Sequence, residues 1–397
     1  MKRKWLMFFG KKKRQIKTRR RWLNHSIYIS LALVVLNTGL ALFTIYTLRT
    51  QNTAVTLPNF YSEGMVFQHD KPAFIHGKTS PNTQLTIAIG GSSSSTTSDA
   101  KGDFAVNLAT PPARLQAYRL AITNTQTNRE LAHIDKVYSG NVFLMSGQSN
   151  MELNKANYYG NKDAIRTNTY DGNKKIIDIK QLPSAINDQD VHFIVTKNTT
   201  ASQNSYDLPL QSINQNGWAT ADNTKNTDWL GYLPQQFVIN MRKAEPDIPV
   251  GIIQTAWGGT NITRHMANGD IFNNHIAPLS GYNVAGILWY QGEADTTKED
   301  APKYAERLSL MIGQYRAIFG NDASLPFIQF QLADFKYGGD YWDDVRSAQA
   351  KVASSTYNTA LIDAKGTEKG STALIHPLGK DTLGQTAAKE MMRLLNN

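Results

Sequence analysis

Ser149 and the residues around it are the part of this 397-residue chain whose types and spacing suit ester chemistry. The apolar run Val142–Met145 predicts a buried strand, which ends in small and polar residues just before Ser149. Open α/β sheets place their chemistry at such strand ends. A serine there can attack an acyl carbonyl when a base takes its proton and hydrogen-bond donors hold the oxyanion. We therefore take Ser149 as the candidate nucleophile; the competing interpretation is an ordinary serine-containing turn.

The candidate base is His376, which lies in a loop before the last predicted helix. From that position an imidazole can reach over the edge of a sheet. The other histidines lie beside the N-terminal apolar segment, in a β-rich region, or in loop-like stretches away from the strand ends: His25, His69, His76, His133, His192, His265 and His275. A lone histidine is often structural, but this placement favours a base.

Two glycines follow a second predicted strand, over residues 250–254. Glycine allows the backbone to approach a ligand closely, so the N–H groups of Gly258 and Gly259 are candidate donors to an oxyanion. Their place just after a strand matches that of Ser149. We expect both clusters at one edge of the sheet.

A third predicted strand, over residues 286–290, leads into Gln291 and Glu293. The Gln291 side chain is a candidate oxyanion donor. Glu293 is expected to orient its neighbours or bind a sugar hydroxyl, and the alternative is a solvated loop carboxylate. Because parallel strands end at the same edge of a sheet, the three clusters are expected to face one cleft.

The pattern from residue 142 onward predicts an α/β domain over residues 138–397, with a mostly parallel sheet covered by helices on both faces. Short buried runs alternate there with segments of helical period. The strands are expected over residues 142–145, 250–254, 286–290, 327–332 and 359–362, and the helices over 233–242, 304–319, 345–352 and 383–395. The polar, asparagine-rich region 154–228 is interpreted as long loops over the site or a surface insertion.

A small antiparallel β-sandwich domain is predicted over residues 55–137. Alternating apolar residues occur over 85–89, 104–108 and 118–122, with turn residues between these runs. Nothing in this region converges on chemistry. It could bind a carbohydrate, but a role in bracing the next domain is favoured.

The N-terminal part carries the basic charge of the chain. Residues 1–49 hold twelve Lys and Arg and no Asp or Glu, so the remainder has a net charge of −2 although the whole chain has +10. The remainder therefore has no nucleic-acid footprint. Residues 27–48 form an uncharged, mostly apolar run, long enough to cross a bilayer of about 30 Å.

The basic residues before this run predict a cytoplasmic tail over residues 1–26, a single-pass anchor over 27–48 and an extracytoplasmic remainder. The alternative is a cleaved signal peptide. The chain has no cysteine, which excludes disulfides and thiolate metal sites and is typical of a bacterial cell surface rather than an animal secretory pathway.

The motifs resemble those of the sialate O-acetylesterases, a family of SGNH/GDSL-like carbohydrate esterases. The matching segments are Leu57–Pro72, Ser146-Gly-Gln-Ser-Asn-Met-Glu152, Val250–Thr260, Ile287-Leu-Trp-Tyr-Gln-Gly-Glu293 and Ile375-His-Pro-Leu-Gly-Lys380. Their order covers nearly everything after the apolar run. The resemblance implies an SGNH-type three-layer sandwich with Ser149 as nucleophile and His376 as base. It also implies Gly258 or Gly259 as oxyanion donor, and Gln291 in place of the SGNH asparagine.

One departure from the family concerns the acid behind the histidine. The family has an aspartate two or three residues before it, where this chain has Leu374 and Ala373. Three interpretations remain: a serine–histidine dyad, an acid displaced to Glu368 or Asp363, or reduced activity. The first two are favoured because the other site residues are all present.

The resulting hypothesis is a membrane-anchored carbohydrate O-acetylesterase that acts on sialic acid or another O-acetylated glycan through an acetyl-serine. It requires no metal and no cofactor. Two alternatives remain: a glycan O-acetyltransferase, in which a sugar hydroxyl captures the acetyl group, and a non-catalytic glycan-binding protein.

Overall fold

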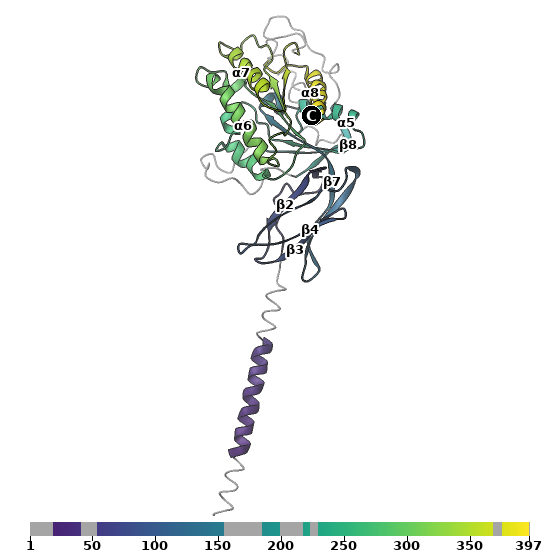
Figure 1. Cartoon of the computed structure of the whole chain (residues 1–397), viewed down its shortest axis with the longest axis vertical. Coiled ribbons are helices and arrows are strands. Elements are labelled where there is room, and N and C mark those ends of the chain that lie inside the picture. Colours follow the sequence, from purple (N-terminus) through teal and green to yellow (C-terminus); the bar gives the residue numbers. More distant parts are fainter. Residues whose placement is uncertain are drawn as a thin grey trace, which may run out of the picture. The chain divides into compact units, whose positions relative to one another are not determined.

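The structure, a computed structural model, describes residues 19–40, 54–154, 185–198, 217–222, 229–367 and 375–396. It contains two compact units, residues 1–54 and 55–397 (Figure 1). The described part of the first unit is one exposed helix, Arg19–Leu40, with a mean hydropathy of 1.3 over its most apolar window. By length and composition this helix can cross a membrane. A signal sequence near the N-terminus would have the same length and composition. It begins within the predicted tail, and residues 41–48 of the predicted anchor lie outside the described residues.

The second unit is built on a mixed sheet with the strand order β13-β12-β11-β7-β10-β8-β9. Its strands are β7 (Arg129–Gly147), β8 (Asn187–Val195), β9 (Ala219–Asp222), β10 (Val250–Gln254), β11 (Gly286–Tyr290), β12 (Phe327–Gln331) and β13 (Thr359–Asp363). All neighbours pair in parallel except β8 and β9. The predicted α/β class is therefore confirmed, with an antiparallel strand at one edge.

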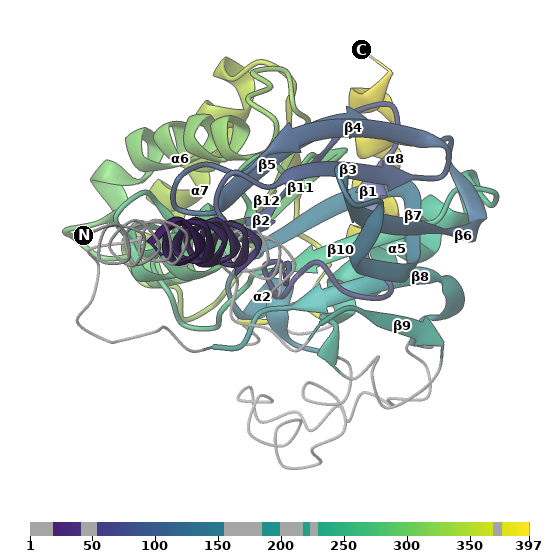
Figure 2. The same cartoon turned by 90° about the horizontal axis from the view of Figure 1, so that it is seen from below.

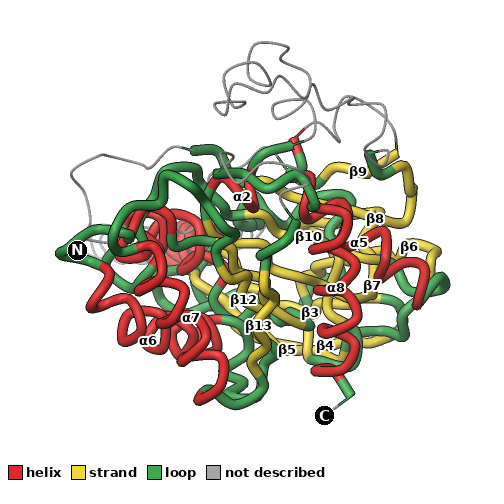
Figure 3. Tube along the Cα trace, turned by 90° about the horizontal axis from the view of Figure 1, so that it is seen from above, coloured by secondary structure: helices red, strands yellow, loops and turns green. Residues whose placement is uncertain are grey.

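Helices cover both faces of this sheet, as predicted, and they form two pairs. α5 (Tyr232–Ala244) packs against α8 (Lys380–Leu395), and α6 (Tyr304–Ile318) packs against α7 (Trp342–Ser355). Figures 2 and 3 show the pairs on either side of the strands.

The alternation of side chains along each strand explains this arrangement. On β11, Trp289 meets Tyr315 of α6, whereas Gly286 lies against Met391 of α8. On β7, Phe143 packs edge-on against Phe237 of α5, with ring centroids 5.0 Å apart. β11 therefore contacts both helix pairs, and β7 packs against the pair that contains α5.

Among the described residues, six further strands precede the α/β part of this unit, and four of them, β1, β3, β4 and β6, belong to the same sheet through β7. The six are β1 (Val66–Gln68), β2 (Pro72–Lys78), β3 (Gln84–Ile89), β4 (Ser92–Thr97), β5 (Asp103–Ala109) and β6 (Arg114–Asn124). β6 pairs antiparallel with β3 and with the first part of β7, while β2 and β5 form a separate antiparallel pair. The predicted boundary at residues 137–138 lies inside β7. The division into a β-sandwich and an α/β domain stays a prediction.

Two strands lie in the region that was interpreted as loops. β8 pairs in parallel with β10, and β9 pairs with β8. The loop interpretation was therefore wrong for residues 187–195 and 219–222. The buried run of β8, residues 191–194, is short and lies among asparagines and aspartates, which hid it from a pattern analysis.

Candidate active site

A sharp turn at the end of β7 places Ser149 at the first residue of the short helix α2 (Ser149–Glu152). Gly147 makes this turn with a φ of 133°, a region that essentially only glycine enters. A Cβ at Gly147 would lie 2.1 Å from the Tyr290 carbonyl oxygen on the neighbouring strand β11. Gln148 donates its N–H to the same oxygen at 2.9 Å. The neighbouring strand therefore holds Ser149 at the carboxyl edge of the sheet.

His376 lies within hydrogen-bond distance of Ser149, with Nε2 2.9 Å from Oγ. Burial, and after it the positive charge of Lys380, lowers the pKa of His376 from 6.5 to about 3. The imidazole is therefore neutral near pH 7, which is the state that can accept a proton. The structure thus brings together two residues that are 227 positions apart in the chain. Their catalytic roles remain predictions.

A buried polar cluster joins the segments that carry Ser149 and His376. Asn150 donates from Nδ2 to Glu293 Oε1 at 2.5 Å and to the Ile375 carbonyl oxygen at 3.1 Å. Lys380 donates from Nζ to Asn150 Oδ1 at 2.5 Å. Glu293 is buried rather than a solvated loop carboxylate, and this burial raises its pKa above its ordinary value.

Asn150 and Lys380 were not selected as site residues from the sequence. The signal that could have found them is their position in the motifs, since Asn150 directly follows Ser149 and Lys380 closes the segment that contains His376.

The two candidate glycine donors differ in their surroundings. Gly258 lies close to the nucleophile, since a Cβ on it would be 3.4 Å from Ser149 Cβ. Its N–H donates to Glu152 Oε2 at 2.5 Å, and Asn198 bonds the other oxygen of this carboxylate. Gly259 is exposed, with a φ of 70° and no heavy atom within 4 Å of an added Cβ.

Gln291 is fully buried, and its side-chain donor is engaged within the protein. Nε2 lies 2.5 Å from Asp295 Oδ2, 3.1 Å from the Thr260 carbonyl oxygen and 3.3 Å from Gln148 Oε1. Gln291 thus connects the polar ends of β7, β10 and β11, and it lies behind the nucleophile turn. Burial is the main cause that raises the pKa of Asp295 to about 6.

Comparison with known proteins assigns the chain to a family. The model of the family "carbohydrate esterase, sialic acid-specific acetylesterase" matches residues 139–393. The chain belongs to this family. The match covers all three strand ends described above together with His376, and it supports carbohydrate acetylesterase activity at the level of the family.

Individual relatives agree with this family of carbohydrate esterases. The chain is 27% identical to XAC1771, a carbohydrate acetylesterase from Xanthomonas citri, over 86% of this chain and 76% of that one, with a TM-score of 0.72. It is 32% identical over 123 residues to the probable carbohydrate esterase At4g34215 of Arabidopsis thaliana. That second match spans 30% of this chain and 45% of the plant protein.

The candidate third acids lie in different surroundings. Asp363 ends β13, where its Oδ1 lies 3.8 Å from Arg346 Nη2 and accepts the Lys365 N–H at 2.9 Å. Within the described residues, the contacts of Asp363 are therefore with these two groups and not with His376. Glu368, Ala373 and Leu374 lie outside the described residues.

A cleft of about 810 Å³ opens beside the nucleophile helix of this family member. Glu152, which accepts the Gly258 N–H, lines this cleft together with Trp218, Trp229 and Asn198. Trp229 is 65% exposed, which is unusual for the largest aromatic side chain. The cleft therefore combines aromatic faces with polar side chains, and one of these, Glu152, shares a short helix with Ser149.

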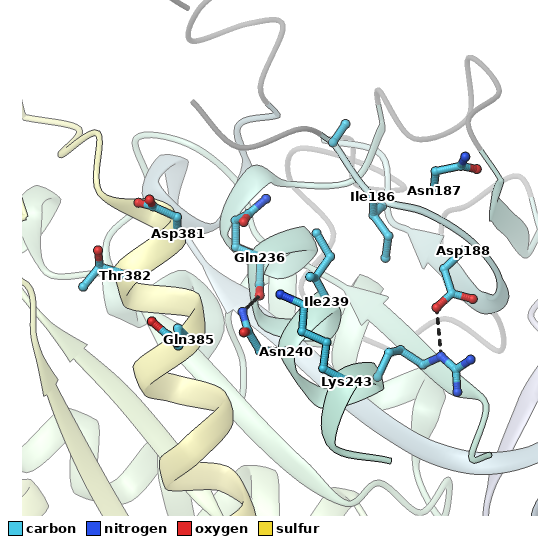
Figure 4. Close-up of a pocket in the computed structure, with 12 residues that line it drawn as sticks. Ile186, Asn187, Asp188, Gln236, Ile239, Asn240, Lys243, Asp381, Thr382 and Gln385 are labelled. Carbon is cyan, nitrogen blue, oxygen red and sulfur yellow. Dashed lines mark hydrogen bonds and ion pairs between the residues drawn. The ribbon is translucent and has the colours of Figure 1, made fainter. Parts of the chain in front are cut away.

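A second cavity, of about 620 Å³, lies at the start of β8 between α5 and α8 (Figure 4). Its walls carry the Asp188–Arg242 ion pair, with Oδ2 and Nε 2.9 Å apart, and several amide side chains. None of the predicted site residues lines either cavity, but the first cleft is lined by Glu152, which belongs to the same short helix as Ser149 and accepts the Gly258 N–H. We therefore place the candidate active site at the Ser149–His376 pair, with the first cleft beside it.

Proposed function

We propose that the protein is a membrane-anchored O-acetylesterase that removes acetyl groups from sialic acid or another acetylated glycan through an acetyl-serine. The observation that carries this proposal is the 2.9 Å approach of His376 Nε2 to Ser149 Oγ at a strand end, in a member of a carbohydrate esterase family. A neutral imidazole at that distance can take the serine proton during attack.

The proposed reaction has two steps. His376 takes the Ser149 proton as Oγ attacks the acetyl carbonyl, and the sugar hydroxyl then leaves with that proton. Water, deprotonated by His376, next attacks the acetyl-serine and releases acetate and free Ser149. Both tetrahedral intermediates carry an oxyanion that needs donors already in place.

We assign the oxyanion to the Ser149 N–H and to a glycine N–H from the loop after β10. Gly259 fits this role because its surroundings are open, while Gly258 donates to Glu152 in the structure. Gln291 contacts Gln148 at the nucleophile turn, so we assign it a supporting role there, and direct donation to the oxyanion stays a prediction.

The structure leaves fewer candidates for an acid that would orient His376. Asp363 is engaged by Arg346 and Lys365, which favours either a serine–histidine dyad or an acid at Glu368. Glu368→Gln separates these arrangements by kcat. A fall of about 10⁴-fold, as for loss of a triad acid, supports Glu368, and an unchanged kcat supports the dyad.

The cleft beside Glu152 is the proposed glycan site. Its volume of about 810 Å³ is in the range of small-molecule sites. An exposed tryptophan face can stack on the apolar face of a sugar ring, and Asn198 can bond hydroxyl groups. The helix Arg19–Leu40 is the proposed anchor, with the esterase unit on the outer side of a bacterial membrane.

The test is acetate release by the full-length protein in detergent. Substrates are O-acetylated sialic acid, acetylated xylan and an aryl acetate, each compared for the wild type, Ser149→Ala and His376→Ala. We expect acetate from at least one acetylated sugar and a loss of about 10³-fold or more in each variant. Equal rates for the wild type and Ser149→Ala would contradict the proposal.

A further inference from the structure

Lys380 lies in a position that stability does not explain. Its side chain is almost fully buried, with a relative exposure of 1%, although isolated buried charges are costly. It is also the first residue of α8, and the N-terminal end of a helix disfavours a cation. An uncharged leucine or methionine would be less costly both in this buried position and at the start of a helix. This placement points to a role in the adjacent site.

Asn150 connects Lys380 to both halves of that site. The amide oxygen accepts the Lys380 ammonium at 2.5 Å, and the amide nitrogen donates to Glu293 and to the Ile375 carbonyl. Asn150 directly follows Ser149, and Ile375 directly precedes His376. The side chains of Lys380, Asn150 and Glu293 therefore connect the nucleophile segment to the base segment by hydrogen bonds that all involve Asn150.

We propose that Lys380 is a positioning residue for the esterase reaction, which holds Asn150 between the two segments and brings a buried positive charge to the site. This inference rests on the proposed function. It assigns to Lys380 a role separate from those of the nucleophile and the base.

The charged groups around Lys380 decide in which direction it shifts the pKa of His376. Asn150 joins Lys380 to Glu293, the charge of Asp295 acts on Glu293, and the Tyr290 ring centroid is 4.8 Å from Lys380 Nζ. After burial, Lys380 is the cause that lowers the pKa of His376. Burial lowers the pKa of Lys380 itself to about 7, against the opposing effect of Glu293.

These shifts give the sign of the pH effect. Lys380 is charged below about pH 7, which is the range where protonation of His376 would stop the reaction. Removing the cation lets His376 take a proton more easily and raises its pKa. The acid limb of kcat/KM, which reports groups of the free enzyme, should then move to higher pH.

The test compares the pH dependence of kcat/KM for four full-length proteins on an aryl acetate. They are the wild type, Lys380→Met, Lys380→Arg and the control Lys389→Met, an exposed lysine on the same helix. We expect the acid limb of Lys380→Met to rise by about one pH unit. Lys380→Arg keeps the charge and should retain the wild-type limb even if the plateau falls, and Lys389→Met should match the wild type.

A second variant guards against loss of folding. Lys380→Met leaves Glu293 as an uncompensated buried acid, whereas Lys380→Met/Glu293→Gln removes both charges and keeps the hydrogen-bonding shape. The double variant should show the same upward shift. An acid limb that stays in place or moves down in both variants, while activity still depends on Ser149, overturns the inference on Lys380 alone.

The pKa of His376 can also be read without turnover. NMR titration of labelled histidines, with His376→Asn for assignment, should show a higher pKa in Lys380→Met than in the wild type. An equal or lower pKa would overturn the inference, even if no acetyl group is released. Failure of the esterase proposal would instead appear as equal acetate release by the wild type and Ser149→Ala.

Discussion

Gly147 is the residue on which the position of Ser149 depends most. Its φ of 133° and the 2.1 Å approach of the Tyr290 oxygen to an added Cβ leave no space for a side chain. Any substitution must push β7 away from β11 and move the turn that presents Ser149. The glycine of the motif is therefore a requirement of packing as well as of backbone conformation.

We predict that Gly147→Ala destabilises the protein by about 3 kcal/mol or more and lowers kcat on the order of 10²-fold. Gly339→Ala is the matched control, because Gly339 also has a positive φ, 73°, but has no heavy atom within 4 Å of an added Cβ. The control should cost about 1–2 kcal/mol and leave kcat unchanged. Melting temperature and aryl acetate turnover measure both effects. Equal effects of the two substitutions would show that packing against Tyr290 does not matter.

Single residues of the site were predictable to different degrees. Ser149, His376 and Glu293 could be proposed because strand-end patterns and motif order mark such positions. The pairing of Ser149 with His376 could be predicted as well, but the hydrogen-bond partners of Glu293 and Gln291 could not, because they come from segments that are distant in sequence. Gln291 shows this clearly: its amide suits an oxyanion, but contacts with Asp295, Thr260 and Gln148 engage it behind the turn.

At the scale of elements, long buried runs were easy to recognise and short ones were not. β10, β11 and β12 match their predicted ranges within one residue, because apolar runs bounded by polar residues identify strands covered on both faces. β8 and β9 escaped because their apolar residues lie within a polar region. The cleft wall formed by Trp218 and Asn198 was missed for the same reason.

The cleft gives a prediction at this scale. Trp229→Ala should raise KM for an acetylated oligosaccharide about 10-fold, because a stacking face worth about 1–1.5 kcal/mol is lost. An aryl acetate, which needs no sugar contacts, should keep its KM and kcat. Tyr357→Ala is the control, since Tyr357 is an exposed aromatic residue that does not line this cleft. If Trp229→Ala leaves KM for the oligosaccharide unchanged, the sugar binds elsewhere.

At the scale of the whole molecule, the chain separates into an N-terminal unit, whose described part holds an apolar helix, and a unit that carries the candidate active site. Composition predicted this separation, because residues 1–49 carry twelve Lys and Arg and no Asp or Glu, whereas the remainder has a net charge of −2. The described helix Arg19–Leu40 contains basic residues, which also favour helix, besides part of the apolar run.

We expect the full-length protein to remain in the membrane fraction after alkaline carbonate washing. A chain that starts at residue 55 should be released, since it lacks the described apolar helix, and should keep its kcat on aryl acetate because residues 55–397 form one compact unit. Fractionation and turnover of both proteins check this. Retention of the shorter chain in washed membranes would place the anchor elsewhere.

The central claim is that His376 activates Ser149 as a nucleophile. The most direct measurement is labelling by a fluorophosphonate, which reacts covalently with activated serines, followed by mass spectrometry of the peptide that contains Ser149. We predict one label on Ser149 in the wild type, no label at that position in Ser149→Ala, and labelling slowed at least about 10²-fold in His376→Ala. Labelling at another residue, or an equal rate in His376→Ala, would contradict the account.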